Sequence, residues 1–453
     1  MTPTLNVFSS RFFQCSLVTA ASILVFAAGA LAGGNEQIIY RFKGGSDGYS
    51  PSGALLKDKT GNLYGVTSEG GTGSCENNEH GCGTVFQLTP PAQPGDPWSE
   101  TVLFRFTGGT DGYAPGGALV ADKNGNLYGT TAAGGDENNG TIYELKRPGS
   151  PSGAWTHRIL YAFKGVPTGR GAGDGSLPGQ LVFDAAGNLY GTTDWGGFCT
   201  KYQGLVNCYG TVFELTAPAE AGGAWTESIL YRFGTTGESN PHSGVIFDSG
   251  GNLYGTTYLG GEGFGGVFEL SPPSAPGGAW TEQALFAFNN SDGGVPDGSL
   301  VFDSAGNLYG TTLQGGPANM GAVFELNPPA SPGGAWTETV LHSFLASGDG
   351  NAPLANVIFD SAGNLFSTAW MGGEFERGTV FELSPPANGG AWTETTLHNF
   401  GSGTDGQEPT AGLIWGGDGA LYGTTLQGGS KNMSQCELDS YAWSCGTVFR
   451  IEP

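Results

Sequence analysis

The sequence is poor in positive charge. Lysine and arginine together number 17 among 453 residues, against 41 aspartates and glutamates, and the formal net charge is −24. Such a field repels phosphate backbones, so nucleic acid is excluded as a partner, and anionic membrane surfaces are disfavoured. Cations, neutral sugars and basic proteins remain as classes of ligand.

Long apolar runs are also scarce. Residues 12–32 form the one stretch that approaches transmembrane length. It ends in Ala-Leu-Ala at residues 30–32, a small-x-small pattern that signal peptidases accept. We interpret residues 1–32 as a signal peptide, with a membrane anchor as the alternative reading. Residues 33–453 are then expected to be secreted or periplasmic, monomeric, and without membrane insertion.

Cysteines are few, and none has the short CxxC spacing typical of zinc sites. Cys15 lies in the leader, and the other six form close pairs. We expect three local disulfides, which suit an oxidising compartment, and metal binding is the weaker rival. The pairs are Cys75 with Cys82, Cys199 with Cys208, and Cys436 with Cys445.

What the chain has is a tandem repeat with a period of roughly 55 to 64 residues. Four phrases recur, each seven times. GNLYGTT or a variant begins at Gly61, Gly125, Gly187, Gly251, Gly306, Gly363 and Gly419. GTVFEL or a variant begins at Gly83, Gly140, Gly210, Gly266, Gly321, Gly378 and Gly446. A third phrase, L-aromatic-x-F, ends at Phe42, Phe106, Phe163, Phe233, Phe288, Phe344 and Phe400. A fourth, apolar phrase closes at Asp58, Asp122, Asp184, Asp248, Asp303, Asp360 and Asp418.

Each phrase reads as a short strand bounded by glycine turns. We name the four strands of a unit A (VIFD), B (LYGTT), C (VFEL) and D (WTETVLHSF). The A–B connection is a hairpin in which the aspartate can bond the turn backbone. Four antiparallel strands repeated seven times predict an all-β, seven-bladed β-propeller.

The ends of the repeat array complete this prediction. The segment EQIIYRF near residue 36 is a D strand without its own A, B and C, and the chain closes on GTVFRIEP, a C strand without its D. The N-terminal strand should therefore complete the seventh blade, which leaves no open sheet edge.

GNLYGTT, GTVFEL and PPGGAWTE, repeated after a signal peptide, resemble the GloVer tandem-repeat family of bacterial secreted and surface proteins. The resemblance covers about residues 36–453. It implies no established activity and no catalytic residues. Related chains often end in an anchoring segment; since this one stops at Pro453, directly after the last strand, no anchor is expected.

The repeat also locates a candidate surface. A–B and C–D turns should share one end of the ring, and they are nearly uniform between units. B–C and D–A loops should share the other end, which we call the loop face, and the B–C loops vary widely. Because function usually lies on variable loops held by a rigid scaffold, the loop face is the candidate site.

An aspartate precedes a proline in six of the seven D–A loops, and Glu238 takes its place in the fourth. We predict a ring of carboxylates that binds a cation or sugar hydroxyls; turn closure by Asx-type hydrogen bonds is the alternative, favoured by the repetition. The residues are Asp47, Asp111, Asp174, Asp292, Asp349 and Asp405.

The B–C loops of units 7, 1 and 2 are neighbours in a closed ring and rich in acids. Ca²⁺ takes about six to eight oxygen ligands, so this sector is a candidate Ca²⁺ site, with a solvated acidic surface as the alternative. The candidate ligands are Glu76, Glu79, Asp136, Glu437 and Asp439. Trp195, Trp370 and Trp443 on B–C loops could stack on sugars or pack against their own loops.

The sequence offers no Ser-His-Asp grouping, and no residue is assigned as catalytic. His342 and His398 stand where other units have Tyr or Phe, so we interpret them as aromatic substitutes, and His80, His157 and His242 are scattered. We therefore expect a non-catalytic binding or surface-interaction propeller for extracellular carbohydrate or protein. The alternative is an extracellular glycoside hydrolase or lyase that uses two carboxylates on the loop face.

Overall fold

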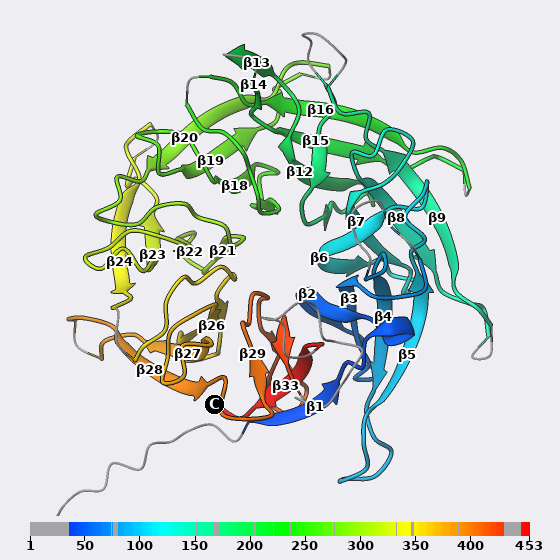
Figure 1. Cartoon of the computed structure of the whole chain (residues 1–453). Coiled ribbons are helices and arrows are strands. Elements are labelled where there is room, and N and C mark those ends of the chain that lie inside the picture. Colours follow the sequence, from blue (N-terminus) through cyan, green and yellow to red (C-terminus); the bar gives the residue numbers. More distant parts are fainter. Residues whose placement is uncertain are drawn as a thin grey trace, which may run out of the picture. The chain divides into compact units, whose positions relative to one another are not determined.

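Almost all regular structure in the described chain is β-strand (Figure 1). The computed structural model describes residues 36–453, apart from 74, 76–79, 151–152, 167–172, 203–204, 221, 236, 276, 332, 346–347, 388 and 430–444. The predicted signal peptide, residues 1–32, lies outside the described residues. One 3-10 turn, η1 (Gly45–Asp47), precedes the first blade.

The strands form seven antiparallel blades, six of four strands and the third of five because two short strands take the place of strand A, and they confirm the predicted propeller. Strand A is β2 (Tyr49–Lys57), β6 (Tyr113–Ala121), β11 (Val182–Phe183) with β10 (Ser176–Pro178), β17 (Ile246–Phe247), β21 (Val301–Phe302), β25 (Ile358–Phe359) and β30 (Ile414–Trp415). Strand B is β3 (Leu63–Glu69), β7 (Leu127–Ala133), β12 (Leu189–Trp195), β18 (Leu253–Thr257), β22 (Leu308–Thr312), β26 (Leu365–Ala369) and β31 (Leu421–Thr425).

The outer half of each blade is equally regular. Strand C is β4 (Thr84–Thr89), β8 (Thr141–Lys146), β15 (Thr211–Thr216), β19 (Gly266–Ser271), β23 (Ala322–Asn327), β27 (Thr379–Ser384) and β33 (Thr447–Ile451). Strand D is β5 (Ser99–Arg105), β9 (Thr156–Ala162), β16 (Thr226–Arg232), β20 (Thr281–Ala287), β24 (Thr337–Ser343), β28 (Thr393–Asn399) and β1 (Gln37–Arg41). Two short extra pairs are β13 (Cys199–Tyr202) with β14 (Leu205–Cys208), and β29 (Gly406–Gln407) with β32 (Gln427–Gly428).

Burial follows the position of each strand in its blade. Strand B, which reads Leu-Tyr-Gly-Thr-Thr in five blades and a close variant in the first and sixth, is buried on both faces in all seven, because a neighbouring blade covers each side. Strand D alternates between exposed and half-buried residues, as an outer edge strand should. Figure 1 shows strand A nearest the axis and strand D at the rim.

The N-terminal strand closes the ring. β1 pairs antiparallel with β33, with Gln37 opposite Arg450 and Arg41 opposite Thr447, and the sheet order is β1-β33-β31-β30. Phe42, which follows β1, is 1% exposed and lies in a cluster with residues of the first blade. The seventh blade therefore consists of both ends of the array, as the sequence predicts.

Aromatic pairs join neighbouring blades at all seven junctions. The phenylalanine that ends strand D contacts the aromatic residue of strand C in the next blade, with ring centroids 5.0 to 5.3 Å apart. These phenylalanines are at most 1% exposed. The pairs run from Phe42 with Phe86 to Phe400 with Phe449. The third repeated phrase is thus a junction motif.

A proline and a glycine form a second contact at each junction. Before strand A, the residue that precedes each proline has a positive φ between 51° and 59°, and its N–H donates to a carbonyl of the previous blade at 2.6 to 3.2 Å. The accepting residue stands before the glycine that opens the GTVFEL phrase; in the fourth blade this glycine is Gly265, one residue before the Gly266 expected from the sequence. At Gly321, for example, φ is 92°, and a Cβ would lie 2.8 Å from Pro353 Cδ. This position therefore requires glycine.

The A–B turns are held by the repeated aspartate. In six blades, its Oδ1 accepts from the N–H groups two and four residues ahead at 2.8 to 3.0 Å. Asp303 bonds Ala305 and Asn307 in this way, and its Oδ2 accepts from Asn307 Nδ2 at 2.8 Å. The predicted structural role of Asp303 is confirmed.

Candidate functional site

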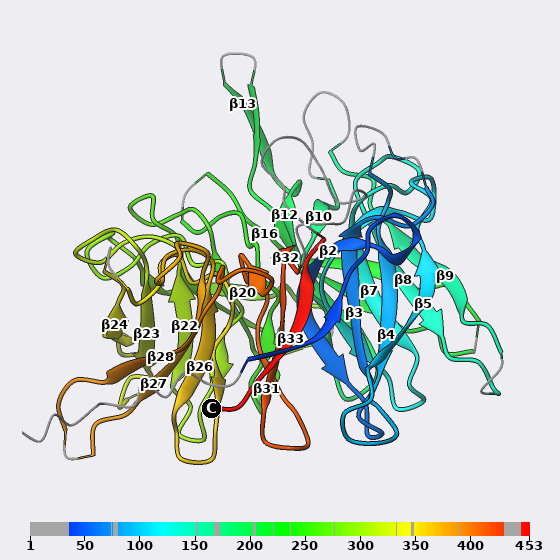
Figure 2. The same ribbon diagram turned by 60° about the horizontal axis from the view of Figure 1, so that its bottom comes forward.

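The two ends of the ring differ in Figure 2, where short turns lie at one end and longer loops at the other. The hairpin β13–β14 stands out from the loop face at the third blade. Every exposed large apolar side chain among the described residues belongs to this face. They are Leu177, Trp195, Phe198, Val206, Leu259, Leu345, Met371 and Phe375, each 36 to 51% exposed.

Three charged side chains meet at the centre of the loop face. His242 Nδ1 lies 2.9 Å from Asp297 Oδ1, and His242 Nε2 lies 3.1 Å from Asp194 Oδ1. Asp194 ends strand B of the third blade, whereas His242 and Asp297 lead into strand A of the fourth and fifth. The cluster therefore bridges three blades.

The two carboxylates keep His242 charged. Burial alone would lower its pKa, but hydrogen bonds to Asp194 and Asp297 outweigh that effect and raise the pKa of His242 to about 10. The ring of Tyr258 lies 4.7 Å from the imidazole. The charged imidazole therefore lies between two aspartate carboxyl groups.

Sequence reasoning missed this cluster by treating His242 as scattered. The available signal was a break in the repeat. His242 and Asp297 follow the proline that precedes strand A, where the corresponding residues Ser52, Gly116 and Thr410 are uncharged.

The six D–A aspartates bond to their own loops. Asp47 accepts from Tyr40 Oη at 2.7 Å and from the N–H of Lys43 at 2.7 Å, and Asp174 accepts from Tyr161 Oη at 2.6 Å. Asp111, Asp292, Asp349 and Asp405 accept backbone N–H groups in the same way. This is the arrangement expected of turn closure, and a ligand-binding role for these carboxylates stays a prediction.

His342 and His398 do more than fill an aromatic position. Their Nε2 atoms lie 3.2 Å from Asp349 Oδ2 and 3.3 Å from Asp405 Oδ2. They therefore take the place that Tyr40 and Tyr161 have in other units as partners of the loop aspartate. Each imidazole ring also packs edge-to-face on the phenylalanine two residues ahead, Phe344 or Phe400.

Five of the six loop aspartates also lie near a glutamate in or directly before strand D of the next blade, whereas Asp111 has His157 in that place. The clearest case is Glu100, whose pKa burial and the neighbouring Asp47 raise to about 7. Burial and the nearby aspartate act in the same direction on Glu227 and Glu338. One carboxyl oxygen of each of these three glutamates is buried without a hydrogen-bond partner in the described chain. Protonation of the glutamate would turn its carboxyl group into a hydrogen-bond donor beside the neighbouring aspartate.

The fourth blade departs from this pattern. Glu238 is 4% exposed and accepts a hydrogen bond from Thr257 Oγ1. In four other blades, two threonines of strands B and C bond each other here, as Thr131 and Thr141 do at 2.8 Å. Gly266 leaves that space open and the Glu238 carboxyl fills it; burial raises its pKa to about 7.

Most of the predicted Ca²⁺ ligands cannot be placed. Glu76, Glu79, Glu437 and Asp439 lie outside the described residues, as do Trp443 and Cys436. Asp136 is exposed. Within the described ranges, no group of three or more His, Cys, Asp or Glu side chains could hold a metal ion.

Two of the three tryptophans predicted to bind sugars are described by the structure, and they differ in exposure. Trp195 is 43% exposed, which suits stacking. Trp370 is half-buried, and its indole N–H has no hydrogen-bond partner among the described residues. Binding roles for both remain predictions.

Residues 25–200 and 198–436 match the model of the Gloeobacter/Verrucomicrobia repeat family. The chain belongs to this family. The match spans most of the repeat array and confirms the resemblance drawn from the GNLYGTT and GTVFEL phrases. No curated protein matches this chain.

Solved structures resemble the repeat protein only distantly. A luciferin-regenerating enzyme is 13% identical, with a TM-score of 0.43, and covers 93% of this chain and 96% of its own. A Bacteroides uniformis protein provisionally assigned as a 6-phosphogluconolactonase is 16% identical, with a TM-score of 0.47, covering 76% and 86%. The PQQ-bound aldose sugar dehydrogenase of Streptomyces coelicolor is 13% identical, with a TM-score of 0.39, covering 93% and 98%. Likenesses this weak carry no argument about activity or ligand.

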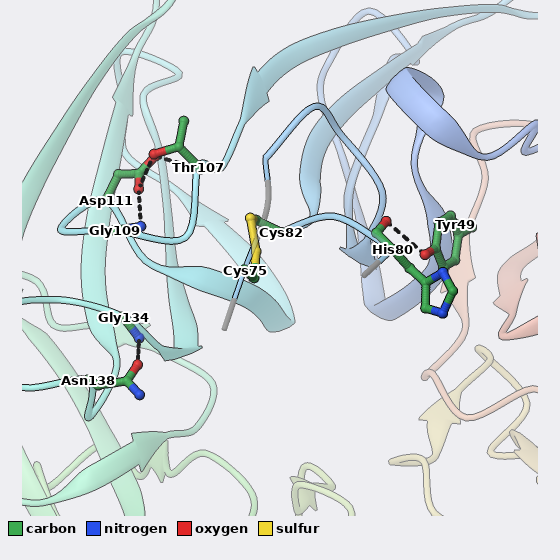
Figure 3. The surroundings of a disulfide bond; sticks show 9 residues. All are labelled: Tyr49, Cys75, His80, Cys82, Thr107, Gly109, Asp111, Gly134 and Asn138. Atoms are coloured by element: carbon green, nitrogen blue, oxygen red, sulfur yellow. Dashed lines mark hydrogen bonds between the residues drawn. A yellow bond between two sulfur atoms is a disulfide. The ribbon is translucent and has the colours of Figure 1, made fainter. Parts of the chain in front are cut away.

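Two predicted disulfides of this family member are confirmed. Cys75 bonds Cys82, and Cys199 bonds Cys208 across the base of the β13–β14 hairpin. Figure 3 shows Cys75 and Cys82 near the loop that Asp111 closes; the Tyr49 hydroxyl donates to the carbonyl oxygen of His80 at 2.7 Å. Cys445 is also disulfide-bonded. Disulfides are typical of oxidising compartments.

Within the residues that the structure describes, no helix is long and apolar enough to cross a membrane.

Proposed function

We propose that the protein is a secreted, non-catalytic binding propeller whose loop face binds extracellular carbohydrate. The supporting observation is the segregation of exposed apolar side chains, since all eight of those described lie on that face. Exposed apolar groups gathered on one surface mark interaction sites, and an aromatic face such as that of Trp195 suits the C–H surface of a sugar ring.

Charge narrows the ligand class. The net charge of −24 disfavours phosphorylated and carboxylated ligands, and the Asp194–His242–Asp297 cluster adds a net negative charge at the centre of the face. Neutral glycans fit this field, and their hydroxyls can bond carboxylate and amide groups.

The site gives less support to the enzymatic alternative. Glycoside hydrolysis needs a carboxylic acid and a second carboxylate placed on either side of the scissile bond. The two carboxyl groups at the centre of the face, Asp194 and Asp297, both lie against His242, so each already has a partner within the protein. Binding without turnover is therefore the stronger proposal.

A glycan array probed with the purified protein tests the proposal. We expect wild-type protein to bind at least one neutral glycan, Trp195→Ala to lose most of that signal, and Gln93→Ala, an exposed control at a C–D turn, to keep it. A reducing-sugar assay on the bound glycans distinguishes turnover from binding. Capture of no glycan would reject the proposal, and release of sugar would replace it with the enzymatic alternative.

A further inference from the structure

The ring surrounds a central cavity of about 440 Å³ that all seven blades line. Small-molecule sites usually measure about 300–1,000 Å³, so the cavity has the size of a ligand site. Its wall consists mainly of the residues that follow the repeated proline in each blade, among them His242 and Asp297, and Asp194 of strand B also belongs to it. The cavity therefore adjoins the charged cluster at the centre of the loop face.

One position in that wall breaks the repeat. Leu300, directly before β21, and its counterparts in the other six blades are at most 3% exposed, so packing fixes this position. The residue before it lines the cavity. This position holds alanine in blades 1 and 2 and glycine in blades 4 and 7, but Gln180, Ser299 and Asn356 in blades 3, 5 and 6.

These three polar side chains retain unused hydrogen-bonding capacity. Gln180 and Ser299 are half-buried, and neither side chain bonds another described residue; Asn356 Nδ2 makes one long contact, 3.3 Å from the carbonyl oxygen of Val357. Amides and hydroxyls both donate and accept, which matches sugar hydroxyls. The scaffold does not use these groups, so they are available to a ligand.

The geometry also limits how a glycan could enter. Because blades surround the cavity on every side, a polymer cannot lie across it, and only a chain end can enter along the axis. Leu177 is 41% exposed and lines the cavity, and its neighbour Ser176 pairs with Trp195. One exposed apolar side chain therefore lines the cavity, and a second, Trp195, stands on the strand that pairs with this segment.

We infer that the cavity binds the terminal residue of a neutral glycan through Gln180, Ser299 and Asn356, while the following residues lie over Leu177 and Trp195. This inference rests on the proposed function and adds to it the mode of recognition. The protein would then recognise chain ends and not internal segments.

The test uses the oligosaccharide with the strongest array signal and titration calorimetry of the full chain. Ser299→Phe fills the cavity, and we expect it to weaken binding at least tenfold with an unchanged melting temperature. Gln180→Ala and Asn356→Ala should each weaken binding about 2- to 10-fold, as expected for one lost hydrogen bond. Ala185→Phe, an exposed A–B turn residue, is the matched control and should bind as wild type.

The outcomes separate this inference from the proposed function. If Trp195→Ala loses binding while Ser299→Phe and both alanine variants bind normally, the loop face binds glycan and the cavity does not. If wild type binds no glycan, both proposals fail. Should Ser299→Phe not fold, competition decides: the free monosaccharide that matches the chain end must displace the oligosaccharide, and failure to do so overturns the inference.

Discussion

The two ends of the ring obey different rules. At the turn end, six of seven A–B connections use the same aspartate, the same two N–H groups and nearly the same distances. On the loop face, the B–C connections range from residues 134–140 in the second blade to a longer, disulfide-bridged hairpin in the third. The repeated framework holds the blades together, so the loop face is free to vary and to carry recognition.

The largest expected effect comes from breaking the framework where it closes. Removing residues 33–43 deletes β1, so β33 loses its outer partner strand and Phe42 leaves the junction cluster. We expect loss of the cooperative melting transition in calorimetry or circular dichroism. A deletion variant that melts like wild type would show that ring closure adds little to stability.

A single turn should matter less. Asp303→Ala removes two backbone contacts and the bond from Asn307 Nδ2, which should cost about 1–2 kcal/mol of unfolding free energy. Urea denaturation measures this, with the exposed neighbour Ser304→Ala as control. A loss of glycan binding by Asp303→Ala at unchanged stability would place function at the turn end and break the comparison.

The strand-D glutamates that lie near loop aspartates, such as Glu338 near Asp292, predict a pH dependence of stability. Burial, reinforced by Asp292, raises the pKa of Glu338 from 4.5 to about 7, so the folded state holds this proton more tightly than the unfolded chain. Its contribution is complete below pH 4.5 and is lost as the pH rises through 7.

Glu338→Gln should therefore narrow the difference between the melting temperatures at pH 5 and pH 8. The exposed Glu220→Gln is the matched control and should leave that difference unchanged. An unaltered pH profile in Glu338→Gln would mean that the junction carboxyl titrates normally.

The smallest effect on melting is expected in the third-blade hairpin. Cys199→Ser with Cys208→Ser opens a cross-link in a separate two-stranded sheet, so protease sensitivity at residues 196–209 should rise while the melting temperature barely changes. The pair Cys75→Ser with Cys82→Ser should cost more, because both cysteines lie in a junction cluster. Equal effects of the two double variants would contradict this distinction.

Repetition explains how much the sequence could predict. Seven copies of each phrase specify strand order and blade count. They also specify the closing role of residues 37–41, since the N-terminal D strand has no blade of its own and the last unit lacks a D strand. Contacts between blades were harder to foresee, because Glu100 and Asp47 are far apart in sequence and neither deviates from its repeat. Asp194, His242 and Asp297 come from three units, and only alignment of the units shows that charged residues replace uncharged ones.

The most direct test of the account is to measure stability and glycan affinity on the same pair of variants. Trp195→Ala changes an exposed loop-face residue, and it should lower affinity at least about tenfold while the melting temperature stays near that of wild type. Asp303→Ala should lower the melting temperature and leave affinity unchanged. The opposite pattern, in which Asp303→Ala alone loses binding and Trp195→Ala binds normally, would contradict the assignment of recognition to the loop face.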